Sequence, residues 1–257
     1  MIARGSPADP AERLPTRGTD PADRLPALVR WPARPEPRRP GAVVFDLDGT
    51  LVDTVALRVA AWVAAFAELG MHVEPQLLRP WMGADGHLVA RAGAQAAGRE
   101  IDDALADRID HRSGEHFNRL NATPRPLPGA RDLFLELPRA GIPHAIATAS
   151  RAGQVLASVD ALELPSRPMI VDGSHVRHAK PAPDLLLLAA RRLGVTPDAC
   201  WYAGDSTWDM QAARAAGMTA AGVVTGFATA DNLLEAGADF ATQDLAELQR
   251  RILDAPR

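Results

Sequence analysis

Two carboxylates two residues apart, Asp46 and Asp48, stand directly after a short apolar run, residues 42–45. Such a run is typical of a buried strand in a parallel sheet, and the alternation of a strand places both carboxylates on one side of the chain. Two neighbouring carboxylates repel each other, which favours a bound cation or a raised pKa, and their oxygens suit Mg²⁺. The pair therefore predicts a magnesium or acid–base site at the end of this strand, where Gly49 lets the chain turn sharply.

Three other charged residues have types and positions that suit the same chemistry. Asp205 and Asp209 stand four residues apart at the start of an expected helix, so they share a face near its positive end. Lys180 is the only lysine in a chain with 28 basic residues. Because a planar guanidinium does not replace a compact ammonium, Lys180 fits a site that rejects arginine, with a chance surface lysine as the alternative.

Apolar runs like 42–45 recur along the chain and alternate with amphipathic segments. The further runs expected to be strands are 144–148, 169–171, 199–203 and 221–224. Helical spacing is found in the segments 182–193 and 208–216. Strands that alternate with helices predict an α/β fold with a doubly wound, Rossmann-like parallel sheet. Ligands bind such sheets at the carboxyl ends of the strands, which is where Asp46 and Asp48 are expected.

Residues 57–125 break this alternation and contain no expected strand. Their Ala-, Leu- and Arg-rich segments predict helices, with the bounds 57–69, 85–97 and 102–119. We therefore expect an all-helical insertion in a core made of residues 41–56 and 126–257, with a proline-stiffened connector near residue 124. Residues 1–40 hold nine of the 22 prolines and eight arginines, which predicts a disordered extension.

Composition excludes several classes of function. Net charge is -4 and no long block of Lys and Arg lies outside the extension, so a nucleic-acid surface is not expected. The apolar run 185–190 is far shorter than the ~20 residues of a membrane helix. Cys200 is the only cysteine, which excludes an intramolecular disulfide and suits a reducing compartment. We expect a cytoplasmic protein, a monomer or homodimer, with a small molecule as its partner.

The octapeptide DLDGTLVD, from Asp46 to Asp53, resembles the first motif of the haloacid dehalogenase-like superfamily of phosphohydrolases. The hydroxyl-bearing segment 148–150, the lysine segment 180–184 and the acidic segment 204–209 resemble the other three motifs and follow in the family's order. Four motifs in order are a specific signal, and the resemblance covers residues 42 to about 250. Within the superfamily the chain is similar to the phosphoglycolate phosphatase and β-phosphoglucomutase group, whose helical cap occupies the place of the insertion.

The resemblance implies a Mg²⁺-dependent phosphatase that hydrolyses a small phosphomonoester through an aspartyl phosphate. Asp46 would be the nucleophile, and Asp48 would protonate the leaving oxygen and then activate water. Lys180 would pair with the transferring group, and Thr148 would donate its hydroxyl to a phosphoryl oxygen. The implied metal ligands are Asp46, Asp48 through its carbonyl, Asp205 and Asp209, the last of which would also contact Lys180.

Five further residues are expected to contact substrate. Ala149, Ser150 and Gly49 belong to the motifs that would surround the phosphate, although Ser150 suits a helix N-cap equally well. Gly83 lies in the segment WMGADGH, which is similar to the cap loop of phosphoglycolate phosphatases and suits a lip over the site; a plain turn is the alternative. Arg91 would hold a substrate carboxylate bidentately, with a surface arginine as the alternative.

Other reactions of the superfamily fit less well or stay open. Asp48 argues against a dehalogenase, and the absence of a lysine from residues 57–125 argues against a phosphonoacetaldehyde hydrolase. A sugar phosphomutase of the β-phosphoglucomutase type would use the same core residues and stays open. A non-catalytic module that binds phosphometabolites is the alternative from another class. Hydrolysis is preferred to the mutase reaction because the cap resembles that of phosphoglycolate phosphatases more closely and lacks lysines for a second phosphate. An enzyme is preferred to the non-catalytic module because Asp46, Asp48, Lys180 and Asp205 are all present.

Overall fold

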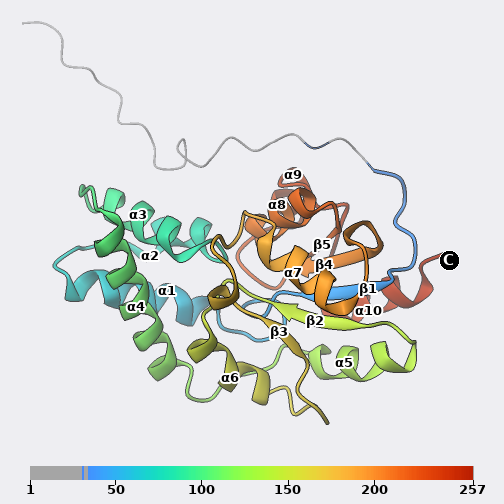
Figure 1. The fold of residues 1–257 in the computed structure, drawn as a ribbon. Helices are drawn as coiled ribbons and strands as arrows, with labels where there is room; N and C mark the ends of the chain where they lie inside the picture. The colour runs from blue at the N-terminus through green and yellow to red at the C-terminus, as the bar shows by residue number, and fades with distance from the viewer. Residues whose placement is uncertain (1–30, 32–33, 257) are drawn as a thin grey trace, which may run out of the picture.

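The computed structural model describes residue 31 and residues 34–256. Its sheet has six parallel strands in the order β3-β2-β1-β4-β5-β6. The strands are β1 (Ala42–Phe45), β2 (His144–Ala147), β3 (Met169–Val171), β4 (Cys200–Gly204), β5 (Thr219–Val223) and β6 (Phe240–Thr242). This order is that of a doubly wound sheet whose winding reverses between β1 and β4. The predicted fold class is therefore confirmed (Figure 1).

Helices cover both faces of the sheet, and β1 shows why its sequence is continuously apolar. Val43 and Phe45 belong to one apolar cluster, and Ala42 and Val44 to the other. The first cluster is covered by α5 (Ala130–Arg139), α6 (Ala152–Asp160) and α10 (Leu245–Asp254). The second is covered by α7 (Asp184–Leu193), α8 (Thr207–Ala216) and α9 (Ala230–Glu235).

Between β1 and β2 the chain forms a helical insertion to one side of the sheet (Figure 1). It consists of α1 (Val55–Glu68), α2 (Pro75–Leu78), the 3₁₀ turn η2 (Arg79–Trp81), α3 (Gly86–Ala96) and α4 (Asp103–Leu120). The three helices expected from the sequence appear as α1, α3 and α4. The insertion has its own apolar cluster, which includes Phe66 and Ile109. Trp208 of α8 joins this cluster, stacking on Trp81 with ring centroids 5.4 Å apart.

Two connectors join the insertion to the core, and they lie side by side. The Asp53 amide donates to the Arg125 carbonyl at 2.9 Å, and the Leu127 amide donates to the Leu51 carbonyl at 2.9 Å. The outgoing and returning chains are thus tied together at the edge of the core. This is where the sequence predicts the boundary of a cap that opens and closes.

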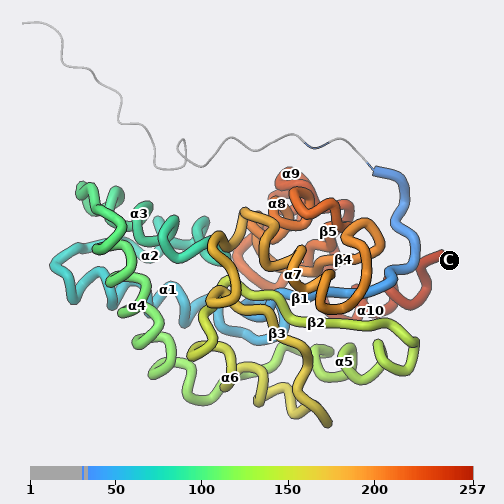
Figure 2. Tube along the Cα trace, in the orientation of Figure 1, coloured from blue at the N-terminus to red at the C-terminus, as the bar shows by residue number. Residues whose placement is uncertain are grey.

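The expected disordered extension, residues 1–40, lies mostly outside the described residues, but residues 34–40 at its end have hydrogen-bond partners in the core. Arg34 Nη1 donates to the Met218 carbonyl at 2.6 Å, and the Arg38 carbonyl accepts from Trp201 Nε1 at 3.1 Å. The start of the described chain runs beside the C-terminal helix in Figure 2, where the Arg39 amide donates to the Pro256 carbonyl. Residues 34–40 therefore lie against the core, held by these hydrogen bonds, although most of them are exposed. Within the described residues, no helix combines the length and apolar character needed to cross a bilayer.

Candidate active site

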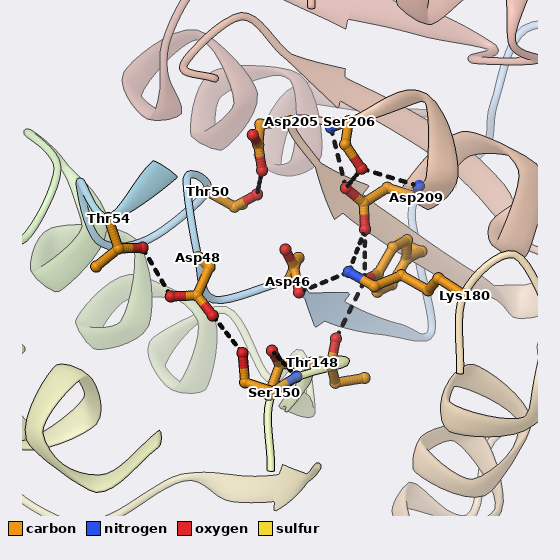
Figure 3. A network of polar contacts seen from close by, with 12 residues as sticks. Asp46, Asp48, Thr50, Thr54, Thr148, Ser150, Lys180, Asp205, Ser206 and Asp209 are labelled. Atoms are coloured by element: carbon orange, nitrogen blue, oxygen red, sulfur yellow. Dashed lines mark hydrogen bonds and ion pairs between the residues drawn. The ribbon is translucent and has the colours of Figure 1, made fainter. Parts of the chain in front are cut away.

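The candidate site lies at the carboxyl ends of β1, β2 and β4, where the winding of the sheet reverses. Asp46 follows β1, Thr148 follows β2 and Asp205 follows β4. Lys180 comes from the loop between β3 and α7 and reaches the same point. Figure 3 shows Asp46 between Lys180 and Asp48, so four separate segments converge on one carboxylate.

Asp46 is held where one of its oxygens remains open. Its side chain is 2% exposed, and Lys180 Nζ lies 2.8 Å from Oδ1. None of the described residues donates a hydrogen bond to Oδ2, and Asp46 lines the main cavity. Burial raises the pKa of Asp46 to about 7 against the opposing effect of Lys180. An open carboxylate oxygen beside a cation is the arrangement that a nucleophile needs.

Lys180 is completely buried and remains charged. Burial alone would lower its pKa, but the carboxylates of Asp209 and Asp46 outweigh that effect and hold the pKa above its usual value. The ammonium lies 2.7 Å from Asp209 Oδ1. An arginine would place a wider, planar group in this buried gap, which agrees with the choice of the chain's only lysine here.

Asp209 is saturated with hydrogen-bond donors. Its Oδ1 accepts from Lys180 Nζ and lies 2.9 Å from the Tyr202 hydroxyl. Its Oδ2 accepts from the Ser206 amide at 3.0 Å and the Ser206 hydroxyl at 2.6 Å, in a capping box at the start of α8. The contact with Lys180 expected from the sequence is present. Both Asp209 oxygens already have protein donors, so the metal role that the sequence also assigned to Asp209 stays a prediction.

The buried carboxylates suit a bound metal ion. Ligand atoms of Asp46, Asp205 and Asp209 lie within 4.8 Å of one another, with one ammonium to balance three carboxylates. Burial raises the pKa of Asp205, and the charges of Asp209 and Asp46 raise it further. A methyl group at Gly49 would lie 2.4 Å from Asp205 Oδ2, so the backbone closes tightly around this carboxylate. A cation at this point would offset the excess negative charge, and the cluster can bind a metal.

The Asp48 side chain points away from the carboxylate cluster. Its Oδ2 accepts from Arg58 Nη2 at 2.8 Å and from the Ser150 hydroxyl at 2.5 Å, and its Oδ1 accepts from the Thr54 hydroxyl at 2.7 Å. Burial by itself would raise the pKa of Asp48, but Arg58 and these hydrogen bonds outweigh it, and the pKa lies below its usual value. Asp48 is therefore ionised in this arrangement.

The segment after β2 forms the wall of the site expected to surround a phosphate. Thr148 is 1% exposed, and its hydroxyl accepts a hydrogen bond from the Ser150 amide at 3.2 Å. The N-cap alternative for Ser150 is wrong, because α6 begins at Ala152 and its N-cap is Arg151. A methyl group at Gly173 would lie 2.4 Å from the Ala149 carbonyl, so the loop after β3 packs closely against this segment.

A cavity of about 400 Å³ opens above these residues, between the core and the insertion. Among its lining residues are Asp46, Asp48, Gly83, Thr148, Ala149, Ser150 and Lys180. Gly83 has a φ of 89°, and a methyl group there would lie 2.6 Å from Ser206 Oγ. Arg91, by contrast, binds Asp103 and the Ile101 carbonyl within the insertion and does not line the cavity. The expectation that Arg91 contacts substrate is not supported, because α3 directs it toward the start of α4.

Several residues of the site were not recognised from the sequence. Arg58 and Thr54 contact Asp48 from the first turns of α1, and Tyr202 and Ser206 position Asp209. The capping-box spacing of Ser206 and Asp209 is a signal that sequence alone carries. Arg58 stands four residues after Thr54 and so shares its helix face, but only the fold shows that this face meets Asp48.

Comparison with known proteins agrees with this geometry. Residues 43–223 match the haloacid dehalogenase-like hydrolase family, a span that contains every motif residue described above. The chain belongs to the haloacid dehalogenase-like hydrolases. The predicted resemblance and the prediction of an enzyme are thereby confirmed.

Among its relatives in this family is a phosphoglycolate phosphatase of Pseudomonas putida, 32% identical over 73% of this chain and 71% of that protein. Another is the fructose-1-phosphate phosphatase YqaB of Escherichia coli, 30% identical over 72% of this chain and 97% of that protein. The structure of a hydrolase from Pseudomonas syringae superposes with a TM-score of 0.79 at 31% identity, covering 84% of this chain and 99% of that one. A β-phosphoglucomutase from Clostridium difficile superposes with a TM-score of 0.70 at 20% identity over 81% of this chain and 92% of that one, and so shares the fold.

Proposed function

We propose that this hydrolase is a Mg²⁺-dependent phosphatase that cleaves a small phosphomonoester through an aspartyl phosphate on Asp46. The observation that carries the proposal is the Asp46 carboxylate, which has one oxygen 2.8 Å from Lys180 Nζ and stands at the base of a cavity. The names of the relatives that are 30–32% identical support a phosphate ester as substrate.

In the first step Asp46 Oδ2 attacks phosphorus, forming the bond to the carboxylate as the bond to the leaving oxygen breaks. The buried ammonium of Lys180 holds Asp46 and offsets negative charge on the transferring group. Thr148 lies at the wall of the cavity and donates its hydroxyl to a phosphoryl oxygen. Tyr202 and Ser206 keep Asp209, and through it Lys180, in position.

Asp48 acts as the general acid and then as the general base of the proposed reaction. Its lowered pKa suits the second step, in which it accepts a proton from the water that hydrolyses the aspartyl phosphate. In the first step it must already hold a proton and release it to the leaving oxygen, which its contact with Arg58 disfavours, so we expect it to exchange that contact for the substrate when the ester enters. Mg²⁺, held by Asp46, Asp205 and the Asp48 carbonyl, would supply the positive charge that brings a phosphoryl group near these carboxylates.

A phosphomutase would use the same core residues and return the phosphoryl group to the sugar. Hydrolysis is proposed because the relatives named as phosphatases are 30–32% identical, whereas the similarity to the Clostridium difficile mutase is one of fold. The chain also has no second lysine to bind another phosphate, since Lys180 is its only lysine and forms ion pairs with Asp46 and Asp209.

The test is phosphate release from a set of small phosphomonoesters, with Mg²⁺ or with EDTA. The set contains 2-phosphoglycolate, sugar monophosphates, nucleotides and an aryl phosphate. We expect release that requires Mg²⁺ and disappears in Asp46→Asn. Release that persists in Asp46→Asn, or none with any ester, would overturn the proposal.

A further inference from the structure

The far end of the cavity must hold the part of the substrate that leaves with its oxygen, if the proposed phosphatase reaction is correct. The cavity volume of about 400 Å³ is typical of sites that enclose whole organic ligands. Asp46, Thr148 and Lys180 form its phosphoryl end. The remaining wall comes from α1, α3 and α4 of the insertion and from the loops after β2 and β3, so its chemistry shows what the leaving group is.

Asp110 of α4 presents a half-satisfied carboxylate to this far end. Its side chain is 13% exposed and lines the cavity. Oδ2 accepts from Arg151 Nε at 3.0 Å, whereas none of the described residues donates a hydrogen bond to Oδ1. A methyl group at Gly86 would lie 2.3 Å from Oδ1, so glycine at this position leaves room for the carboxylate. This oxygen is accessible and has no donor among the described residues, so it can accept a hydrogen bond from the hydroxyl of a ligand.

The cations around this end are mostly neutralised by protein carboxylates. Arg58 pairs with Asp48, Arg151 with Asp110, and His87 lies 2.8 Å from Asp107. To bind any of these three cations, an anionic leaving group, such as the carboxylate of 2-phosphoglycolate, would have to displace its carboxylate partner. Arg177 is the exception: it lines the cavity, is exposed, and has no ion pair with a described residue.

Three apolar side chains also line the cavity. Trp62 of α1, Met82 and Val89 line the cavity and are each at most 7% exposed. A ring or carbon chain that carries hydroxyls has apolar C–H faces that pack on such a wall while its hydroxyls reach an acceptor. Apolar side chains and an open carboxylate oxygen in one cavity thus fit a neutral, polyhydroxylated group better than a short anionic one.

We propose that the far end of the cavity is a hydroxyl-binding subsite, and that the enzyme prefers sugar or polyol monophosphates to 2-phosphoglycolate. Asp110 is the specificity-determining residue, and its Oδ1 accepts a hydrogen bond from a substrate hydroxyl. Arg151 holds the carboxylate in place through Oδ2, and Gly86 leaves the space that Oδ1 occupies.

The experiment compares kcat/KM for hexose monophosphates, 2-phosphoglycolate and an aryl phosphate in the full-length protein with Mg²⁺. We expect a hexose monophosphate to exceed 2-phosphoglycolate by about tenfold or more. In Asp110→Asn the ratio of hexose-phosphate to aryl-phosphate kcat/KM should fall about 10- to 100-fold, which is the effect of one hydrogen bond to a charged group. If Asp110→Asn does not fold, Gly86→Ala, whose added methyl would displace Oδ1, should lower the same ratio.

Two variants distinguish the alternatives. Arg151→Gln removes the charge of the ion pair but keeps the Asp110 carboxylate and a side-chain amide that can donate to Oδ2, so it should change the ratio much less than Asp110→Asn. An equal change would show that the ion pair, and not acceptance by Oδ1, sets the preference, and it would overturn the proposal. A preference for 2-phosphoglycolate that is lost in Arg177→Ala would also overturn it, while leaving the phosphatase reaction intact. If the proposed phosphatase function itself is wrong, the aryl phosphate is not hydrolysed either, which distinguishes that failure from failure of the subsite.

Discussion

Replacing Lys180 by methionine removes the only ammonium from a group of buried carboxylates. Lys180 Nζ lies 2.8 Å from Asp46 and 2.7 Å from Asp209, and all three side chains are at most 2% exposed. Breaking a buried ion pair by removing one partner costs about 3–5 kcal/mol, because the remaining charge is left without compensation. At about 2–4 °C per kcal/mol for a protein of this size, the Tm in EDTA at pH 8 should fall by about 6–20 °C.

The loss of Tm in Lys180→Met should be larger at pH 8 than at pH 5.5. At pH 5.5, below the pKa of about 7 of Asp46, that carboxyl already holds a proton in the folded protein, so the missing ammonium costs less. The matched control is Arg91→Met, which removes one positive charge from an exposed ion pair with Asp103 and should cost less than about 1 kcal/mol. Thermal unfolding followed by circular dichroism measures both variants. A Tm loss in Lys180→Met no larger than that in Arg91→Met would refute this reasoning.

Three further predictions concern the metal, the backbone and the proton-handling residue. In EDTA, the free energy of unfolding should fall as the pH rises from about 4 to about 7, because Asp46 and Asp205 retain protons in the folded protein that they lose on unfolding. Mg²⁺ should therefore raise the Tm more at pH 8 than at pH 5.5. Equal increases in Tm at the two pH values would contradict this prediction. Gly49→Ala should abolish phosphate release, since its methyl would lie 2.4 Å from the Asp205 carboxylate. The control Gly70→Ala has a similar positive φ and open space around it, so it should keep its activity and cost only about 1 kcal/mol of stability. Equal activities of the two variants would count against the assigned metal site. Ser150→Ala removes the hydroxyl 2.5 Å from an Asp48 oxygen and should lower kcat for an aryl phosphate about tenfold in steady-state assays, and an unchanged kcat would separate Ser150 from the proton transfer.

The convergence of the motif residues could be predicted from the sequence because they follow strands. Strands β1, β2 and β4 end directly before Asp46, Thr148 and Asp205, and parallel strands bring their carboxyl ends to one edge of the sheet. Strand β6 was not predicted, since its three residues give no distinct apolar run. The position of Lys180 was predicted only through its motif, because it lies on a loop whose path depends on the fold.

Residues of the cap could not be predicted in the same way. Whether a helix residue faces the cavity depends on how α1, α3 and α4 pack on each other and on the core, which spacing alone does not show. Arg91 therefore appeared to be a candidate although it binds Asp103, while Arg58 and Asp110, which do line the cavity, were missed. The arginines of residues 34–40 show the same limit: their partners are carbonyl groups more than 100 residues away in the chain.

The most direct test of the central claim is to trap the phosphoryl group on the protein. The enzyme is mixed with Mg²⁺ and its best phosphomonoester and quenched in acid within the first turnovers, and the peptide that contains Asp46 is then sequenced by mass spectrometry. The account predicts one added phosphoryl group on Asp46, absent from Asp46→Asn and from an unmixed sample. A phosphoryl group on another residue, or turnover by the wild-type enzyme with no label on Asp46 at any quench time, would contradict it.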